Sequence, residues 1–283
     1  MTHLTIAGSA GSPIAPKSAL ERVAPAVVVV LATVVLVTWL LNTPPGLLGK
    51  ADAIAYAICH RIVSHSLMMG AVAMPLCARC TGMYLGALLG MITMAVMGRR
   101  RFGGLPRRPL LLVLIGFVGI MGVDGVNSYL TFFPRLPHLY EPQNWLRLIT
   151  GTLCGLALAG LVYPVLNQTL WRDWEDRPVL GKFRELGLLL ALSAVIVALV
   201  LSNVPAIMYP FALLSAVGVL AMLVALNTTM LLLASRRENR VVNWTGAIIP
   251  LLAGFTMTMI EIGAVDVVRF SIFHTWSGLG GLG

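Results

Sequence analysis

Seven long apolar segments recur along this chain of 283 residues, and they constrain its fold more than any other feature. Each is long enough to cross a hydrocarbon layer about 30 Å thick as a helix. Charged residues make up only 11% of the chain, against about 25% in ordinary soluble domains, so too few are present to coat a globular surface. The segments are 24–41, 76–98, 110–131, 146–166, 186–204, 210–233 and 245–265. We therefore predict an all-α, polytopic membrane helix bundle with about seven transmembrane helices.

One further segment, 51–70, is too short and too polar to span, and we expect a short interfacial or re-entrant helix there. We divide the chain into four parts. Residues 1–22 are expected to be a disordered cytoplasmic N-terminus, and residues 267–283 an external flexible tail. Between them lie a membrane domain with the first four spans, 23–166, and the C-terminal membrane helices, 167–266.

The distribution of Lys and Arg predicts the orientation, because cytoplasmic loops carry an excess of positive charge. Of the 20 basic residues, 14 lie in the N-terminal segment and in the loops 99–109, 172–184 and 236–240. We expect a multi-pass protein of the plasma membrane with its N-terminus in the cytoplasm and its C-terminus outside. The net charge of +9 is then loop charge that faces anionic lipid, and nucleic acid is not an expected partner.

A cluster of metal-ligating side chains stands at the entrance to the second span, on the external side of this topology. Cys59 and His60 are followed, after an apolar gap, by Cys77 and Cys80. On a helix that starts near Leu76, Cys77 and Cys80 are three residues apart and share a face. Three cysteines and a histidine are a donor set typical of structural zinc, so zinc is the cofactor that we expect.

Other interpretations of the cysteines remain open at this point. A Cys-x2-Cys pair at a helix N-terminus has a lowered thiol pKa and can cycle to a disulfide. A static disulfide could pin the short helix to the second span, as an external compartment permits. The thiols could also be inert. Cys154, in the middle of the fourth span, is expected to be a small core residue.

Charged residues within the third and fourth spans form a second candidate site. Asp124 follows an apolar run that begins at Leu110, about 21 Å along a helix. A carboxylate at that depth is costly unless it is paired, protonated or bound to a cation. Arg147 opens the fourth span at a similar depth, so we predict an Asp124–Arg147 pair. This pair either locks the two spans together or is catalytic, with Asp124 as general base and Arg147 and Asn144 orienting an anionic or carbonyl group.

A repeat of small residues in the second span predicts close helix packing. Gly82, Gly86 and Gly90 are four residues apart, so they lie along one side of a helix. Small residues at this spacing let a second helix approach closely in lipid, and we assign the glycines to packing.

The motif residues also carry a resemblance to a known family. They are Cys59-His60, Ser66, the run Pro75-Leu76-Cys77-Ala78-Arg79-Cys80-Thr81-Gly82-Met83-Tyr84-Leu85-Gly86, Asp124-Gly125, Asn144, Arg147, Thr150 and Gly151. In these positions the chain resembles an uncharacterised prokaryotic membrane-protein family, the domain of unknown function 2085, over about residues 55–155. The resemblance implies that the cysteines, His60, Asp124, Asn144 and Arg147 form one unit, and it implies no particular reaction. His65 departs from the family, which usually has Arg at this position.

Three functions from different classes fit these observations, and the sequence leaves open whether the protein is an enzyme. The first is an enzyme that uses the external metal or thiol site on a lipid or quinone-like substrate. The second is a non-catalytic accessory subunit of a larger membrane complex, such as an energy-conversion assembly, whose cysteine cluster is structural. Its partners would be other membrane subunits as well as the lipid bilayer. A transporter is ranked last, because the last three spans are almost uniformly apolar.

Overall fold

The computed structural model describes residues 19–131, 133 and 137–276, and this part of the chain consists mainly of helices. The α-helices are α1 (Ala19–Asn42), α2 (Gly46–Ile58), α3 (Ala78–Val96), α4 (Arg108–Leu130), α5 (Asn144–Leu170), α6 (Phe183–Val200), α7 (Pro205–Ala234) and α8 (Trp244–Phe273). Seven of them, all but the short α2, are long and apolar enough to cross a membrane, which confirms the predicted fold class. The predictions for residues 1–18 and 277–283 lie outside the described residues.

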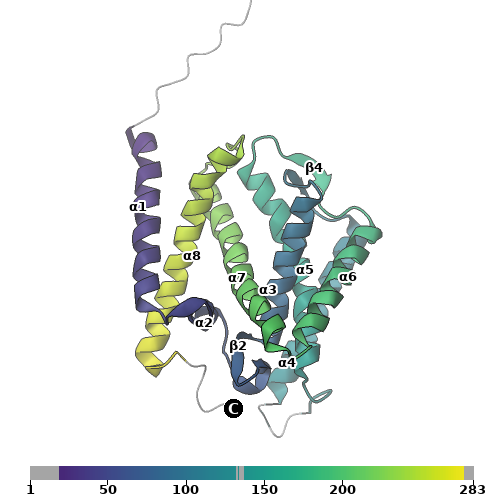
Figure 1. Ribbon diagram of the computed structural model, residues 1–283. Helices are drawn as coiled ribbons and strands as arrows, with labels where there is room; N and C mark the ends of the chain where they lie inside the picture. The colour runs from purple at the N-terminus through teal and green to yellow at the C-terminus, as the bar shows by residue number, and fades with distance from the viewer. Residues whose placement is uncertain (1–18, 132, 134–136, 277–283) are drawn as a thin grey trace, which may run out of the picture.

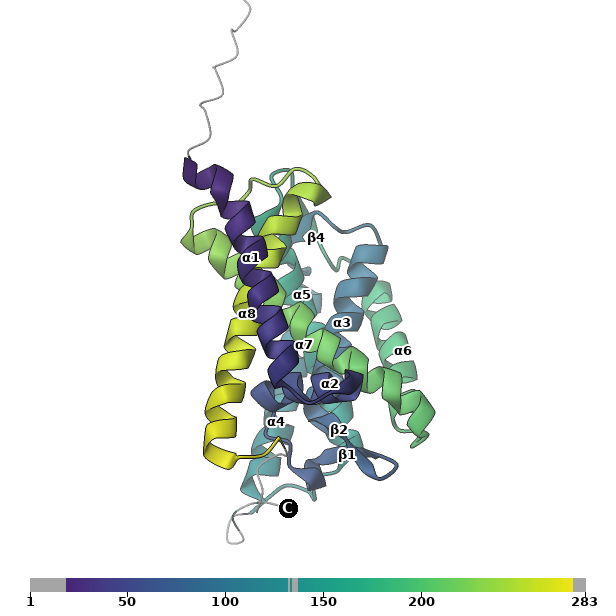
Figure 2. The same cartoon turned by 60° about the vertical axis from the view of Figure 1, so that its left-hand side comes forward.

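The long helices stand side by side as a bundle, with α1 at one edge next to α8 and with α3 and α5 near the centre (Figure 1). The short α2 lies across one end of the bundle, where it contacts α7 and α8 (Figure 2). Several helices are longer than predicted. Helix α7 begins at Pro205 rather than at 210, and α8 continues to Phe273 rather than ending at 265. The first residues of the predicted tail 267–283 are therefore helical.

The prediction of one helix over 51–70 is wrong in its second half. Helix α2 ends at Ile58, and the chain then forms a turn and an antiparallel hairpin. These elements are a 3-10 turn, η1 (Val63–His65), and two strands, β1 (Ser66–Met69) and β2 (Val72–Cys77). Gly70 has a φ of 66° at the hairpin turn, a conformation that glycine adopts without strain. Strand β2 leads directly into α3, so it fixes Cys77 at the mouth of that helix.

Helices α3 and α5 pack closely along much of their length. A Cβ atom on Gly82 or Gly86 would overlap backbone atoms of Leu148 or Thr152, so only glycine allows this approach. Two glycines of α5, Gly151 among them, meet the backbone of α3 in the same way. The predicted packing role of Gly82 and Gly86 is confirmed.

The arginine-rich loops lie at the end of the bundle that is far from the hairpin and α2. A short parallel pair of strands, β3 (Phe102–Gly104) and β4 (Glu175–Pro178), joins two of these loops at the end far from the hairpin (Figure 1). Arg99 pairs with Glu185 there at 2.5 Å, and this pair fastens the end of α3 to the start of α6. The two ends of the bundle therefore differ in chemistry, with basic loops at one and the cysteines at the other.

Candidate metal centre and its polar surroundings

Three cysteines from separate elements converge at the start of α3. Cys59 follows α2, Cys77 ends β2 and Cys80 lies in the first turn of α3. Their sulfur atoms all lie within 4.8 Å of one another. Cys59 and Cys77 are each 2% exposed, and Cys80 is half-buried. These three cysteines and Cys154 in α5 all have free thiols, and they are all the cysteines of the chain.

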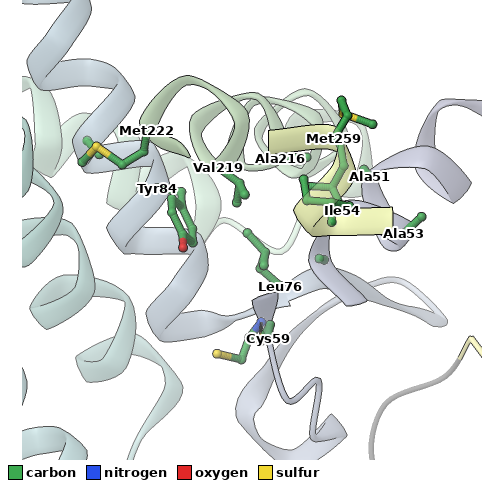
Figure 3. Packing of buried hydrophobic residues seen from close by; sticks show 14 of the residues in the cluster. Ala51, Ala53, Ile54, Cys59, Leu76, Tyr84, Ala216, Val219, Met222 and Met259 are labelled. Atoms are coloured by element: carbon green, nitrogen blue, oxygen red, sulfur yellow. Dashed lines mark hydrogen bonds between the residues drawn. The ribbon is translucent and has the colours of Figure 1, made fainter. Parts of the chain in front are cut away.

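The surroundings of Cys59 are apolar on one side and polar on the other. Figure 3 shows Cys59 beside Leu76 at the edge of a buried apolar cluster. The backbone N–H of Cys77 donates to the sulfur of Cys59 at 3.4 Å. Hydrogen bonds from the thiols of Cys77 and Cys80 lower the pKa of Cys59, although burial opposes them. The same contact with Cys59 raises the pKa of Cys77 to about 12. The geometry therefore favours a thiolate at Cys59, with the other two thiols as donors.

His60, the predicted fourth ligand, lies outside the group of three sulfurs. Its Nε2 is 3.3 Å from Nδ1 of His65, and the two rings meet edge to face. A hydrogen bond from His60 also helps to lower the pKa of Cys59, so the imidazole lies next to that sulfur. A tetrahedral site that includes His60 requires its ring to turn from His65 toward the cysteines. Burial and the charge of Arg147 lower the pKa of His65 to about 4, which keeps that ring neutral near pH 7.

The ion-pair partner of Asp124 is Arg79, so the predicted Asp124–Arg147 pair is wrong. The guanidinium of Arg79 donates from Nε to Oδ2 of Asp124 at 3.0 Å, and its Nη2 donates to the same oxygen. The hydroxyls of Tyr140 and Thr150 donate to the carboxylate at 2.8 and 3.3 Å. Asp124 is 1% exposed. Its pairing follows from the rotation of α3 about its axis, which turns Arg79 toward α4 while Cys80 faces Cys59.

Arg147 and Asn144 connect α5 to the segment that carries the cysteines. Asn144 donates from Nδ2 to the backbone carbonyls of Ser64 and Ser66, and its Oδ1 accepts from Arg147 at 2.8 Å. Arg147 is 4% exposed, and its Nε has no hydrogen-bond partner among the described residues. Arg79 repels this guanidinium, whereas Asp124 and Cys77 attract it. Arg147 is therefore a buried cation with an unused donor between the sulfur cluster and the ion pair.

The sequence interpretation missed Arg79 and Tyr140 as members of this network. Arg79 stands just inside an apolar span, where an unpaired cation is costly, and that position was a usable signal that it needs an acid. Tyr140 carried no such signal. It reaches Asp124 only because the loop that holds it folds back onto α4, and no sequence pattern indicates that fold. Asn127 holds that loop in place, since its side chain bonds the backbone of Leu139 and Tyr140.

The fold and the site define a polytopic helical membrane protein with a cysteine cluster at one end of the bundle. A family model described as "Predicted membrane protein (DUF2085)" matches residues 59–161, from the first cysteine to the middle of α5, and confirms the resemblance inferred from the motif. The chain is also similar to the uncharacterized protein MJ1492 of Methanocaldococcus jannaschii, with 29% identity over 124 residues, which are 44% of this chain and 72% of the relative. No solved structure matches the chain.

Proposed function

We propose that the protein binds zinc through Cys59, Cys77 and Cys80, with His60 as fourth ligand. The observation that carries this proposal is the convergence of three sulfurs from three elements within 4.8 Å. Bonds of about 2.3 Å to a tetrahedral zinc ion would separate the sulfurs by about 3.8 Å, so a small contraction accommodates the ion. The N–H···S hydrogen bond from Cys77 is a typical outer contact of a metal-bound thiolate.

The charges around the cluster support the same donor set. Three thiolates and one zinc ion carry a net charge of about −1, and a buried complex of that charge needs a compensating cation. Arg147 is such a cation, because it is 4% exposed and has a donor without a partner among the described residues. Zinc bound at the cluster would therefore stabilise Arg147 as well as the thiolates.

A structural role for this site is the function that the geometry supports best. A zinc ion would tie α2, the hairpin and α3 together at one end of the bundle. Asp124 accepts hydrogen bonds from Arg79, Tyr140 and Thr150, so its oxygen lone pairs are occupied by contacts within the protein. We therefore assign Asp124 a positioning role. We propose a zinc-stabilised accessory subunit, whose exposed apolar helices contact lipid and other membrane subunits.

A reaction on a lipid or quinone-like molecule is the second candidate function, and Arg147 is the observation that favours it. Its unused Nε donor could bind a carbonyl or anionic group, with Asn144 fixing the direction of the guanidinium. Zinc held by the three cysteines alone would keep an open position and supply a Lewis acid. His60 would then lie beside the metal without binding it.

Metal analysis of the purified protein tests zinc binding directly. Protein purified in detergent under reducing conditions should contain roughly one zinc per chain, and cobalt in its place should show the visible bands of a tetrahedral thiolate site. Replacing Cys59, Cys77 or Cys80 by Ser should remove the metal. Cys154→Ser is the matched control, because Cys154 is equally buried but lies apart from the cluster. Absence of metal after zinc is supplied, or a disulfide between two of the three cysteines, would refute the site.

His60→Ala separates the two candidate functions. In a closed four-ligand site, loss of the imidazole should weaken zinc binding by about tenfold or more and lower the melting temperature. In an open three-cysteine site, the zinc content and the melting temperature should stay unchanged. A competition titration with a zinc chelator measures the affinity, and Cys154→Ser again provides the control.

We further propose that the cysteine end faces the outside of the cell, on the strength of the basic loops at the other end. A membrane-impermeant thiol reagent should label Cys80, the half-buried cysteine, in intact cells after the metal has been chelated. Labelling only after lysis would place this end in the cytoplasm.

A further inference from the structure

A cavity of about 710 Å³ lies between α1 and α8, and the zinc proposal does not involve it. This volume is in the range of small-molecule pockets. The wall changes character along the helices. Val34 and Ile260 lie nearer the middle of α1 and α8, whereas Asn42 and Ser271 lie near the helix ends on the cysteine side. Such a gradient fits an amphiphile with its polar head toward the membrane surface and its chain in the apolar part.

Asp266 gives this cavity a specific polar group. It lines the wall and is 3% exposed. Its Oδ2 accepts a hydrogen bond from Nε1 of Trp39 at 3.1 Å, whereas its Oδ1 has no partner among the described residues. Arg269 does not fill this gap, because its guanidinium donates to the carbonyls of Tyr56 and Cys59. A buried acceptor without a donor is costly, so a ligand with a hydroxyl group would stabilise the site.

Aromatic rings and charges narrow the chemistry of this ligand. Trp39, Phe270 and Trp276 line the cavity, and the ring centroids of Phe270 and Trp276 are 5.3 Å apart. They offer faces and edges on which a planar ring can pack. The ammonium of Lys50 already lies 5.7 Å from the ring centroid of Trp39, which disfavours a cationic ligand. The carboxylate of Asp266 in the wall disfavours an anionic headgroup. A neutral aromatic ring with a hydroxyl group meets both conditions.

We propose that the α1–α8 cavity binds a lipid-soluble aromatic alcohol of the quinol type. Its ring packs among Trp39, Phe270 and Trp276, one hydroxyl donates to Asp266, and its apolar chain follows α1 and α8 into the bundle. The site is separate from the cysteine cluster, so the proposal holds whether or not zinc binds there.

Binding of decylhydroquinone to the full-length protein in detergent micelles, under anaerobic conditions, tests this proposal. Quenching of tryptophan fluorescence should be saturable, because two tryptophans line the cavity. The dimethyl ether of the same compound keeps the ring and the chain but cannot donate a hydrogen bond. We expect it to bind about tenfold more weakly, the effect of one hydrogen bond of about 1.4 kcal/mol.

Single substitutions test whether the ligand binds at Asp266. Asp266→Ala should lower the affinity for decylhydroquinone to that for the ether, whereas Trp244→Phe, which lies at the opposite end of α8, should leave it unchanged. Equal affinities of the two compounds for the unaltered protein would overturn the proposal without any variant. Unchanged hydroquinone binding by a folded Asp266→Ala protein would also overturn it. Phosphatidylglycerol that excludes the hydroquinone would assign the cavity to phospholipid and overturn it as well.

Discussion

Two buried aspartates on transmembrane helices differ in how completely the fold satisfies them. Asp124 on α4 is 1% exposed and accepts hydrogen bonds from three side chains, including an ion pair with Arg79. Asp266 on α8 is 3% exposed, yet within the described part of the chain it accepts only from Trp39. Similar burial therefore accompanies different roles. Asp124 completes the contacts among α3, α4 and α5, whereas Asp266 keeps acceptor capacity that the fold does not use.

The largest expected effect comes from breaking the Arg79–Asp124 pair. Asp124→Asn or Arg79→Leu should each lower the free energy of unfolding by about 3–5 kcal/mol, because each strands a buried charge. The double variant should lose less than the sum of the two, since it removes both charges. Equilibrium unfolding in mixed micelles measures all three values.

Arg147→Leu provides the matched control for this cycle. It removes a guanidinium that is more deeply buried than that of Arg79 but does not form an ion pair with Asp124. Its coupling with Asp124→Asn should be much weaker than that of Arg79→Leu, because Asp124 attracts Arg147 only through its charge. Additive losses for Arg79 and strong coupling for Arg147 would reverse the assignment of the pair.

A smaller effect is expected when one donor to Asp124 is removed. Tyr140→Phe deletes the hydroxyl that lies 2.8 Å from Oδ1, and we expect a loss of about 1–2 kcal/mol in the free energy of unfolding. Tyr209→Phe is a suitable control for the loss of a hydroxyl, because Tyr209 is exposed on α7. A loss no greater than that of the control would show that Asp124 does not depend on Tyr140.

Asp266→Asn should change stability less than either change at the Asp124 site. An asparagine oxygen can still accept from Trp39, and the substitution removes a buried charge whose second oxygen has no donor within the described residues. We expect the free energy of unfolding without ligand to change by less than about 1 kcal/mol. A loss as large as that of Asp124→Asn would contradict the distinction between the two aspartates.

The last prediction is a pH dependence in the alkaline range, and it arises at Tyr140 on the Asp124 side. Burial and the hydrogen bond to Asp124 raise the pKa of Tyr140 to about 12. A raised pKa means that the folded state favours the neutral phenol. Its contribution to stability is therefore complete below about pH 10 and is lost as the pH rises through 12. The free energy of unfolding, measured between pH 9 and 12, should fall less steeply with pH for Tyr140→Phe than for the unaltered protein. An unchanged slope would contradict the assignment.

The spans could be predicted because length and apolar composition suffice to define a membrane helix. The hairpin could not be predicted from the same information. Its strands, Ser66–Met69 and Val72–Cys77, are short apolar runs around a glycine, and such runs are equally compatible with a helix. The hairpin is decided by the contact between Cys59 and Cys77, to which the chain has to return. This contact is tertiary, so the local sequence does not show it.

The candidate site shows the same limit. The spacing of the cysteines was enough to predict that they come together. The expected shared helix face was wrong, because Cys77 ends β2 and only Cys80 lies on α3. The partner of Asp124 was not predictable in this way. Arg79 and Arg147 both stand at the same end of the bundle, and only the rotations of α3 and α5 about their axes decide which of them reaches the carboxylate. The contact between Asp266 and Trp39 joins residues 227 positions apart, a distance over which no sequence pattern operates.

The interlocked glycines of α3 and α5 also bear on how the protein is made. During translation α3 emerges before α5, and Arg79 precedes Asp124 by 45 residues. Until α4 and α5 have been made, the glycines of α3 lack the backbone of α5 against which they pack, and Arg79 lacks the carboxylate of Asp124. Helix α3 therefore reaches its stable surroundings in lipid only when α4 and α5 have joined it. A nascent chain that stopped after α4 would present an unfilled glycine groove, a feature by which membrane quality control can recognise an unfinished protein.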